Sequence, residues 1–534
     1  MRFIHLLILL VALVLTPWRA AQALTSEQAL AMAQGSNAAR EAAIEAAATQ
    51  AQPGLAPFLE AMQAKRLMVD GERVLEQRGG TTVDAVTGDA IANADGADAV
   101  KINNRLRRAI AAALASLALF DDDRNRRLAA AIELSQRPSA DDLALLQKAL
   151  EREKDPAIRA VLGTASGRLE LSDTDPRIRE SAARRLGASD TREIRQLLRA
   201  RLTATDGAPA ETNDTVRREL RNAYASVEFR VFMGEISATL FAGISLGSVL
   251  LLAALGLAIT YGLMGVINLA HGELMMIGAY ATYVVQQLFR TPALSPWFDA
   301  YLIAAIPVAF VVAALVGALL ERLVIRHLYG RALETLLATW GISLILMQAV
   351  RSLFGAQNVA VENPSWMSGG LVLGSNLVLP WNRIAIVVFA ILVLAVVASL
   401  ILRTRLGLFV RAATQNRTMA RCMGVPTSRT DTLAFALGAG IAGLAGCALS
   451  QIGNVGPDLG QAYIVDSFLV VVVGGVGQLS GAVVAALGLG VFNKILEGMS
   501  GAVIAKIILL VAVIVFIQKR PQGIFALRGR SADA

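Results

Sequence analysis

The pattern of hydrophobic positions divides this 534-residue chain into two parts of different character. In residues 24–230, apolar residues recur at helical spacing, and only the stretch 67–100 looks extended and rich in turns. From residue 236 onward, apolar runs reach roughly the 20 residues that a helix needs to cross a bilayer. The pattern predicts a mainly α-helical domain at 24–230, followed by an all-α polytopic membrane domain at 236–525.

The first 23 residues, MRFIHLLILLVALVLTPWRAAQA, have the features of a secretory signal peptide. Arg2 precedes an apolar run that is too short to span a bilayer comfortably, and Ala21-Gln22-Ala23 forms an A-x-A cleavage site. The alternative is an uncleaved anchor. In both cases we expect the domain at 24–230 to lie outside the cytoplasm, in the periplasm.

Weak internal similarity marks the second part of this domain. The segments DPAIRAVLGTASGRL (155–169) and DPRIRESAARRLGAS (175–189) both begin with Asp-Pro-x-Ile-Arg, a pattern typical of a helix start. The second resembles a HEAT-type helical repeat, which would provide a docking surface for a partner. The alternative is an ordinary Ala-rich helical bundle, because two imperfect copies are few for a repeat array.

The apolar runs predict about eight or nine transmembrane helices. The count is uncertain by one because the polar break at 265–272 could lie at membrane depth and the region 464–518 could hold a re-entrant pair. The predicted spans are 238–264, 273–289, 301–325, 333–354, 384–402, 432–453, 464–477, 481–496 and 502–518.

The net charge of +8 comes from the membrane part of the chain. Residues 24–230 hold 30 Lys and Arg against 31 Asp and Glu, so the excess lies between the apolar runs. With the first span entering the cytoplasm, the basic loops at 326–331 and 403–431 and the basic C-terminus all fall inside, as the positive-inside rule requires. The charge therefore indicates membrane topology, and no nucleic-acid partner is expected.

Motifs for enzymatic chemistry are missing from the sequence. There is no P-loop motif, and GAGIAG (438–443) sits in an apolar span without a preceding strand. The chain has three histidines and two cysteines, Cys422 and Cys447, which are too few for a His/Cys metal site. We expect no catalytic residues, no metal and no enzyme activity.

One apolar span carries small residues at every fourth position, which places them on a single helical face. Small residues on such a face allow two membrane helices to approach closely, so we expect helix packing there. These residues are Ala434, Gly438, Ala442, Gly446 and Ser450.

A polar break interrupts the apolar pattern in GVINLAHGELMM, residues 265–276. It carries Asn268, His271 and Glu273, and ionisable groups at membrane depth usually face a cavity or the interior of a bundle. One alternative is a broken helix beside a translocation pathway. The other is a short cytoplasmic turn, with Asn268 capping a helix and Glu273 in its first turn.

The loop at 403–431 contains a predicted helix, VRAATQNRTMARCMGV, which ends at Gly424 before Pro426. Arginines would keep this helix at the aqueous surface, and alanines and methionines would give it a small apolar face. It is either a basic loop that fixes topology or a helix that docks into a groove on a cytoplasmic partner.

Three segments together resemble the branched-chain amino-acid type of ABC-importer permease. They are SLGSVLLLAALGLAITYGLMGVINLAHGELMMIGAY (245–280), the stretch RLGLFVRAATQNRTMARCMGVPTSRTDTLAFALGAGIAGLAGCAL and VVVVGGVGQLSGAVVAALGLG. The resemblance covers roughly 236–525 and implies an inner-membrane protein with a second permease subunit, two cytoplasmic ATPase subunits and a periplasmic substrate-binding protein. ATP would be bound by the partner subunits, with no cofactor in this chain.

The resemblance also implies roles for both polar segments. Asn268, His271 and Glu273 become candidates for the translocation path. Within the 403–431 loop, Arg411–Val425 becomes the element that couples the chain to the ATPases, with the candidate residues Arg411, Ala412, Ala413, Asn416, Ala420 and Gly424.

The long N-terminal domain and the ending QKRPQGIFALRGR resemble the urea-importer permeases within that family. Urea transport is therefore expected, on resemblance alone. The alternatives are a branched-chain amino-acid or short-amide permease and, from a different class, a membrane-anchored periplasmic scaffold or sensor. So many spans, with stripes of small residues, argue against a simple anchor.

Overall fold

The computed structural model describes residues 24–525 apart from 51, 53, 79–80, 92–96, 137, 204–210, 266–267 and 375–376. The predicted signal peptide at 1–23 lies outside the described residues. The chain divides into two compact units between Val231 and Phe232, and each is described by itself.

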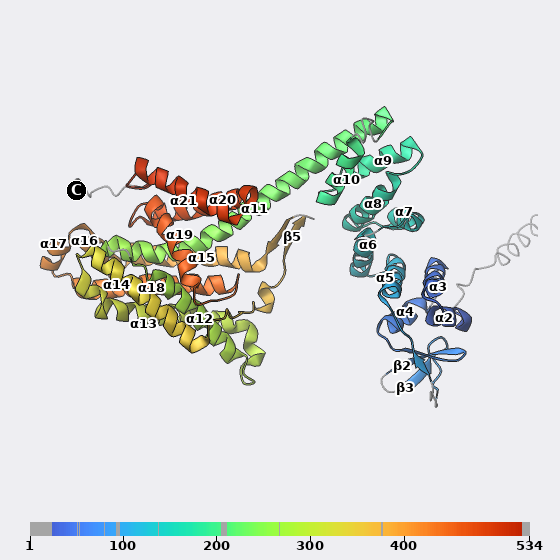
Figure 1. The fold of residues 1–534 in the computed structure, drawn as a ribbon, viewed down its shortest axis with the longest axis horizontal. Coiled ribbons are helices and arrows are strands. Elements are labelled where there is room, and N and C mark those ends of the chain that lie inside the picture. The colour runs from blue at the N-terminus through green and yellow to red at the C-terminus, as the bar shows by residue number, and fades with distance from the viewer. Residues whose placement is uncertain are drawn as a thin grey trace, which may run out of the picture. The chain divides into compact units, whose positions relative to one another are not determined.

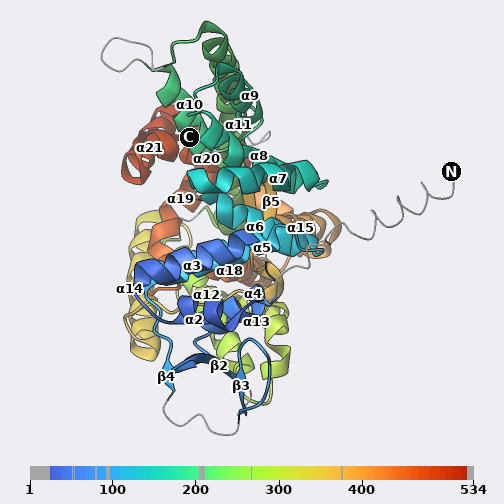
Figure 2. The same cartoon turned by 90° about the vertical axis from the view of Figure 1, so that its right-hand side faces the viewer.

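The first unit begins with three helices and a small antiparallel sheet. Thr25 starts the first helix with a capping box, in which its side chain and that of Gln28 each accept the other's backbone N–H. The stretch predicted to be extended forms four strands in the order β3-β2-β1-β4, labelled in part in Figure 2. The elements are α2 (Ser26–Ala33), α3 (Asn37–Gln50), α4 (Leu55–Gln63), β1 (Leu67–Asp70), β2 (Arg73–Arg78), β3 (Thr81–Asp84) and β4 (Asp98–Ala99).

The rest of this unit is helical, and successive helices follow one another along it (Figure 1). Asp155 and Asp175 cap two of them, each followed by proline in the first turn, which confirms the predicted helix starts. The elements are α5 (Asn104–Ala118), α6 (Arg124–Gln136), η1 (Ala140–Asp142), α7 (Leu143–Arg152), α8 (Pro156–Glu170), α9 (Pro176–Leu186), α10 (Arg192–Leu202) and the start of α11 (Asp214–Met264).

An arginine in the first turns of several of these helices binds the loop that precedes its helix. Arg127 donates to the carbonyls of Asp121 and Asp122, and Arg179 donates in the same way to Asp173 and Thr174. Arg127 and Arg179 also pair with Glu153 and Glu211, and these hydrogen bonds lower the pKa of both carboxyl groups. The arrangement recurs from helix to helix, and the HEAT-type assignment stays a prediction.

The second unit is a bundle of apolar helices, and among the described residues its only paired strands form one short hairpin. Together with the helical first unit, it confirms the predicted fold class. After α11 the elements are α12 (His271–Phe289), η2 (Ser295–Ala300), α13 (Tyr301–Leu323), η3 (Ile325–Leu328), α14 (Ala332–Phe354), η4 (Ser365–Met367), β5 (Gly370–Gly374), β6 (Leu377–Pro380), α15 (Trp381–Arg403), α16 (Arg405–Gln415), α17 (Arg417–Cys422), α18 (Thr427–Ser450), α19 (Leu459–Gly474), α20 (Leu479–Ser500) and α21 (Ala502–Lys519).

Seven helices in the described part of the chain are long and apolar enough to cross a membrane. They are the C-terminal half of α11 together with α13, α14, α15, α18, α20 and α21. The helices α12 and α19 occupy two further predicted spans but are not among the seven, and α19 has only 16 residues. The predicted total of eight or nine therefore stays a prediction.

The helix α18 lies at the centre of the bundle, next to α12 and α13 (Figure 1). Its small residues face its neighbours, and Ala434, Gly438, Ala442, Gly446 and Ser450 are all buried. On the partner side, a Cβ atom added to Gly278 of α12 would overlap the carbonyl oxygen of Gly443 in α18. The backbones of α12 and α18 are therefore in direct contact, which is the packing that small-residue stripes allow.

This contact predicts that Gly278→Ala destabilises the bundle. The added methyl meets backbone atoms that cannot rotate away, and overpacking of this kind costs typically about 1–3 kcal/mol. We expect a lower thermal unfolding temperature of the purified chain in detergent. Gly341→Ala in α14 is the matched control, because a Cβ atom there meets nothing within 4 Å. Equal unfolding temperatures for the two variants would contradict the packing.

Candidate functional site

The helix α12 begins deep inside the bundle. Its first residue, His271, places Nε2 3.0 Å from the carbonyl oxygen of Ala253, which lies eleven residues before the end of α11. At a rise of 1.5 Å per residue, α12 therefore starts beside a point on α11 about 16 Å before the C-terminal end of α11. The connection between the two helices, which passes Gly265 at a φ of 66°, therefore returns into the bundle. This geometry favours the broken-helix alternative over a turn at the surface.

Asn268 does not cap α12, contrary to one of the sequence alternatives. The N-cap residue is Ala270, and no side chain caps the helix there. Asn268 Oδ1 accepts a hydrogen bond from the Ala270 N–H, 3.0 Å away, so its side chain closes the turn before the helix. Glu273 lies in the first turn of α12, as that alternative expected.

Three buried polar side chains lie within six residues at this break. Asn268, His271 and Glu273 are each at most 3% exposed. Glu273 Oε1 accepts a hydrogen bond from the Ser343 hydroxyl of α14 at 2.9 Å, and Thr339 Oγ1 accepts one from the Leu269 N–H at 3.2 Å. The helices α12 and α14 are thus joined by polar contacts at the same depth.

One polar atom of each of the three side chains has no hydrogen-bond partner within the described part of the chain. These atoms are Asn268 Nδ2, His271 Nδ1 and Glu273 Oε2. Buried polar atoms are costly unless they are paired, so a group of three at one place is uncommon in a structural core. Each of them therefore keeps hydrogen-bonding capacity that no described group uses.

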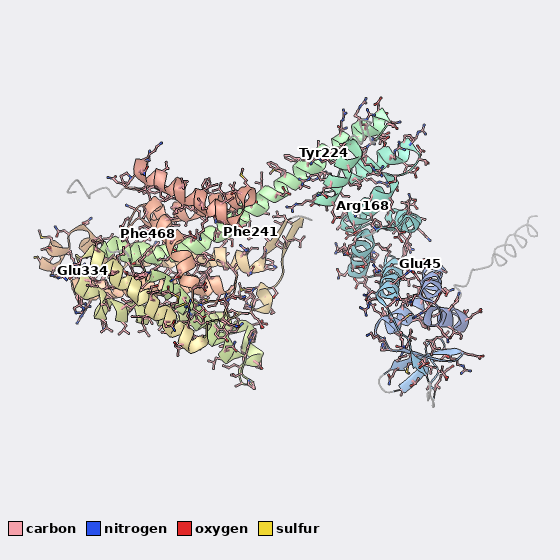
Figure 3. The ribbon with its side chains drawn as sticks, in the orientation of Figure 1. Glu45, Arg168, Tyr224, Phe241, Glu334 and Phe468 are labelled. Carbon is pink, nitrogen blue, oxygen red and sulfur yellow. The ribbon has the colours of Figure 1, made fainter. Side chains whose placement is uncertain are left out.

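A second helix, α19, also begins at this depth. A Cβ atom on Gly460, in its first turn, would lie 2.5 Å from the carbonyl group of Gly272, so the first turns of α12 and α19 touch backbone to backbone. Further along α19, the Phe468 ring (Figure 3) lies 6.4 Å from the Tyr261 ring of α11. Two interrupted helices therefore direct their N-terminal ends, which carry positive partial charge, toward one region.

The predicted span 464–477 begins too late to include this feature. The structure starts α19 at Leu459, preceded by Asp458 and by a return segment in which Val455 pairs with Val359. The polar run QIGNVGPDLGQ at 451–461 is the sequence signal that could have located the second break.

A cavity of about 240 Å³ opens beside the N-terminus of α19. Its polar groups are amides and a carboxylate, with glycine backbone between them. The lining includes Asn358, Gly453, Asn454, Gly456, Asp458 and Tyr463.

A second cavity, of about 270 Å³, lies further along the same face of α19 and is bounded by α11, α20 and α21. It holds two ion pairs, Asp466 with Lys506 at 3.3 Å and Lys494 with Glu497 at 2.6 Å. Charged groups between apolar helices usually face a partner or a water-filled space. Ala462 and Tyr463 line both cavities, so the cavity with two asparagines and the cavity with paired charges lie next to each other along α19.

The loop between α15 and α18 forms two short helices, α16 and α17, where the sequence predicted one. Asn416 separates them, because its backbone is extended at a φ of −151° and its side chain accepts a hydrogen bond from the Met419 N–H. Gly424 ends the segment at a φ of 84°, as expected of a helix-terminating glycine.

The break at Asn416 also divides the predicted apolar face of this loop. Ala413 and Ala420 are buried, Ala412 is half-buried, and Met419 and Met423 are exposed. Arg411 is exposed and its guanidinium donates to the Ile401 carbonyl of α15. The outward-facing surface of the loop is therefore formed by methionines and arginines.

Residues 239–518 match the family model described as the branched-chain amino acid transport system permease component. The chain belongs to this family. It is 30% identical over 288 residues to the high-affinity branched-chain amino acid transport system permease protein BraD of Pseudomonas aeruginosa, which covers 53% of this chain and 93% of BraD. It is 32% identical over 274 residues to LivH of Escherichia coli, which carries the same description, and this match covers 50% of the chain and 86% of LivH.

A more distant relative is the probable branched-chain amino acid transport permease protein LivH of Methanocaldococcus jannaschii, 28% identical over 292 residues, or 52% of this chain and 88% of that protein. No solved structure gives a significant match. The family match begins at residue 239, so the first unit lies outside it. The chain is thus a multi-pass permease of this family with a long additional N-terminal unit.

The buried site predicts that Glu273→Ala abolishes most solute uptake. Removing the side chain leaves the Ser343 hydroxyl without its acceptor and takes away the unpartnered Glu273 Oε2, so we expect uptake to fall roughly ten-fold or more. Ser343→Ala should have a smaller effect in the same direction. Uptake of radiolabelled solute, normalised to the amount of protein in the membrane, measures both.

Ser352→Ala is the matched control for Ser343→Ala, because both serines lie on α14. The Ser352 side chain is exposed, and its hydroxyl donates to the Gln348 carbonyl. Wild-type uptake by Glu273→Ala, at wild-type protein levels, would remove Glu273 from the transport path.

Proposed function

We propose that this chain is the transmembrane permease subunit of an ABC importer for urea, located in the bacterial inner membrane. Separate cytoplasmic ATPase subunits drive it, a second permease subunit completes the pathway, and a periplasmic binding protein delivers urea. ATP binds to the partner subunits in this proposal. The family membership of residues 239–518 supports the permease role.

The observation that carries the proposal for urea is the set of unpartnered polar atoms at the break. Urea has one carbonyl acceptor and two N–H₂ donor groups and carries no charge. Asn268 Nδ2 is a donor that suits the carbonyl, and Glu273 Oε2 is an acceptor that suits an N–H₂ group. The neighbouring cavity, with its amides and glycine backbone, suits the same neutral solute.

The chain's resemblance to urea-importer permeases, in its long N-terminal unit and its C-terminal sequence, adds to this support. His271 is placed differently from the other two residues. Its Nε2 lies 3.0 Å from the Ala253 carbonyl, so in this proposal the imidazole holds the break against α11, and its unpartnered Nδ1 is assigned no contact with urea.

The loop formed by α16 and α17 is the proposed contact with the ATPases. Its six candidate residues differ in exposure. The exposed ones can contact the ATPases, and the buried ones anchor the loop to the bundle. Arg411, Asn416 and Gly424 are exposed and available to a partner, while Ala413 and Ala420 pack inward and Ala412 lies between. Exposed Met419 and Met423 add an apolar surface of the kind that helix-in-groove docking uses.

A branched-chain amino acid is the second candidate solute. The relatives are described as permeases for branched-chain amino acids. The cavity bounded by α19, α20 and α21 combines leucine walls with Asp466 and Lys506, which could bind the ammonium and the carboxylate of an amino acid. The two candidate solutes thus use two neighbouring cavities along α19.

Uptake in a strain that lacks this chain distinguishes the two solutes. We expect the wild-type chain to restore uptake of radiolabelled urea, excess unlabelled leucine not to compete, and Glu273→Ala not to restore it. Lys506→Met, which removes the ammonium from the charged cavity, should retain urea uptake. Restored leucine uptake that Lys506→Met abolishes, without any urea uptake, would favour the amino acid.

The periplasmic position of the first unit is tested with reporters. Alkaline phosphatase fused after residue 200 should be active, and a fluorescent protein fused after residue 415 should fluoresce, because phosphatase folds outside the cytoplasm and the fluorescent protein inside it. This follows from the basic loops lying inside. The opposite pair of results would invert the proposed topology.

A further inference from the structure

Two carboxylates are buried where α13 and α18 lie close to the loop formed by α16 and α17. Glu321 of α13 is fully buried, and Asp431 of α18 is 1% exposed. Each has an arginine partner from a different segment: Arg326 of η3 pairs with Glu321 at 3.2 Å, and Arg417 of α17 pairs with Asp431. Buried carboxylates require such partners, so the positions of these segments depend on one another.

Two further side chains join the ion pairs into one network. Thr432 of α18 lies between Arg326 at 2.9 Å and Glu321 Oε2 at 2.7 Å. Tyr329 donates its hydroxyl to Glu321 Oε1 at 3.1 Å, and the Arg417 guanidinium lies 4.7 Å from the centre of the Tyr329 ring. We call these six residues the clasp: Glu321, Arg326, Tyr329, Arg417, Asp431 and Thr432.

The clasp holds α17 at the start of a long rigid helix. Asp431 lies in the first turns of α18, and Gly446 lies fifteen residues further on, about 22 Å along the helix axis. Between them, Gly438 packs against Gly256 of α11, and Gly446 packs against the backbone of Met275 in α12. These neighbours lie next to His271 and Glu273, so one helix contacts both the clasp and the polar break.

The packing along α18 leaves little room for independent movement. Backbones in direct contact cannot slide past each other without separating, so a displacement of one end of α18 moves the segments at its other end. The charged pairs resist separation because either partner left alone would be a buried, unpaired charge.

We propose that the clasp transmits movements of α17 through α18 to the polar break at 268–273. This inference rests on the proposed function, because a partner ATPase must displace α17. It assigns Arg417 and Asp431 as positioning residues that couple ATP hydrolysis to rearrangement of the transport site. Thr432 of α18, which bonds both Glu321 and Arg326, makes α13 follow the same movement.

The test uses the assembled importer and a thiol probe at the far end of α18. Asn454 lines the amide-rich cavity on the segment that follows α18, and its side chain is exposed. An Asn454→Cys variant, with Cys422 and Cys447 replaced by alanine, is labelled with a maleimide in the presence and absence of ATP and vanadate. The ratio of the two labelling rates measures coupled movement without depending on the identity of the solute.

We expect this ratio to differ from one in the starting variant and to fall to roughly one in Arg417→Gln and Asp431→Asn, while ATP hydrolysis continues. The double variant Arg417→Gln/Asp431→Asn removes both charges, so it leaves no buried unpaired ion. It replaces the single variants in the labelling measurement if those assemble poorly. Arg417→Lys keeps the charge and should restore part of the nucleotide dependence.

Arg331→Gln is the matched control, because Arg331 forms an exposed ion pair with Glu334 at the start of α14, and no clasp residue takes part in that pair. Nucleotide-dependent labelling that persists in the Arg417 and Asp431 variants would overturn the clasp, even if they assemble in smaller amounts. If the labelling rate of the starting variant does not depend on ATP, the ATPase-driven function is overturned as well. The two failures are therefore distinguishable.

Discussion

Everything in the membrane unit depends on close backbone contact between α18 and its neighbours. Lipid provides no hydrogen bonds, so a helix can be interrupted at membrane depth only where other helices enclose the exposed backbone. The glycines of α18 allow that enclosure by bringing α11 and α12 within van der Waals contact. The stripe of small residues is therefore a requirement for the broken helix, and a bulkier stripe would leave the turn at Asn268–Ala270 without this enclosure.

The enclosure explains why polar side chains can remain at the break. Glu273 and Asn268 are held by Ser343 and by the local turn, and each still presents an unpaired atom. A fully satisfied network would bind a solute weakly because it would have nothing to exchange, and a wholly unsatisfied one would destabilise the fold. A partly satisfied group of this kind is suited to a solute that enters and leaves.

Most helix positions were predictable from the sequence because apolar run length is set by bilayer thickness. The starts of α11, at Asp214, and of α19, at Leu459, lie well before the predicted spans. The depth of the break was not predictable, since it depends on His271 meeting Ala253 across the bundle. The start of α19 was missed because Asp458 and Gly460 are polar or small, and hydropathy alone excludes them from a span. Asn416 divided a predicted helix because its side chain competes with the helical backbone.

The partners of charged residues could not be predicted from the sequence either. They determine which segments are held together at the start of α18. Arg417 looked like one of several arginines that fix topology, but it pairs with Asp431, whose burial the apolar surroundings did not reveal. A charge that only fixed topology would be better left in water, because burying it costs desolvation free energy. The burial of Asp431, whose partner Arg417 lies over the Tyr329 ring, indicates that the position of α17 relative to α13 and α18 is specified. A segment needs a specified position in order to transmit force.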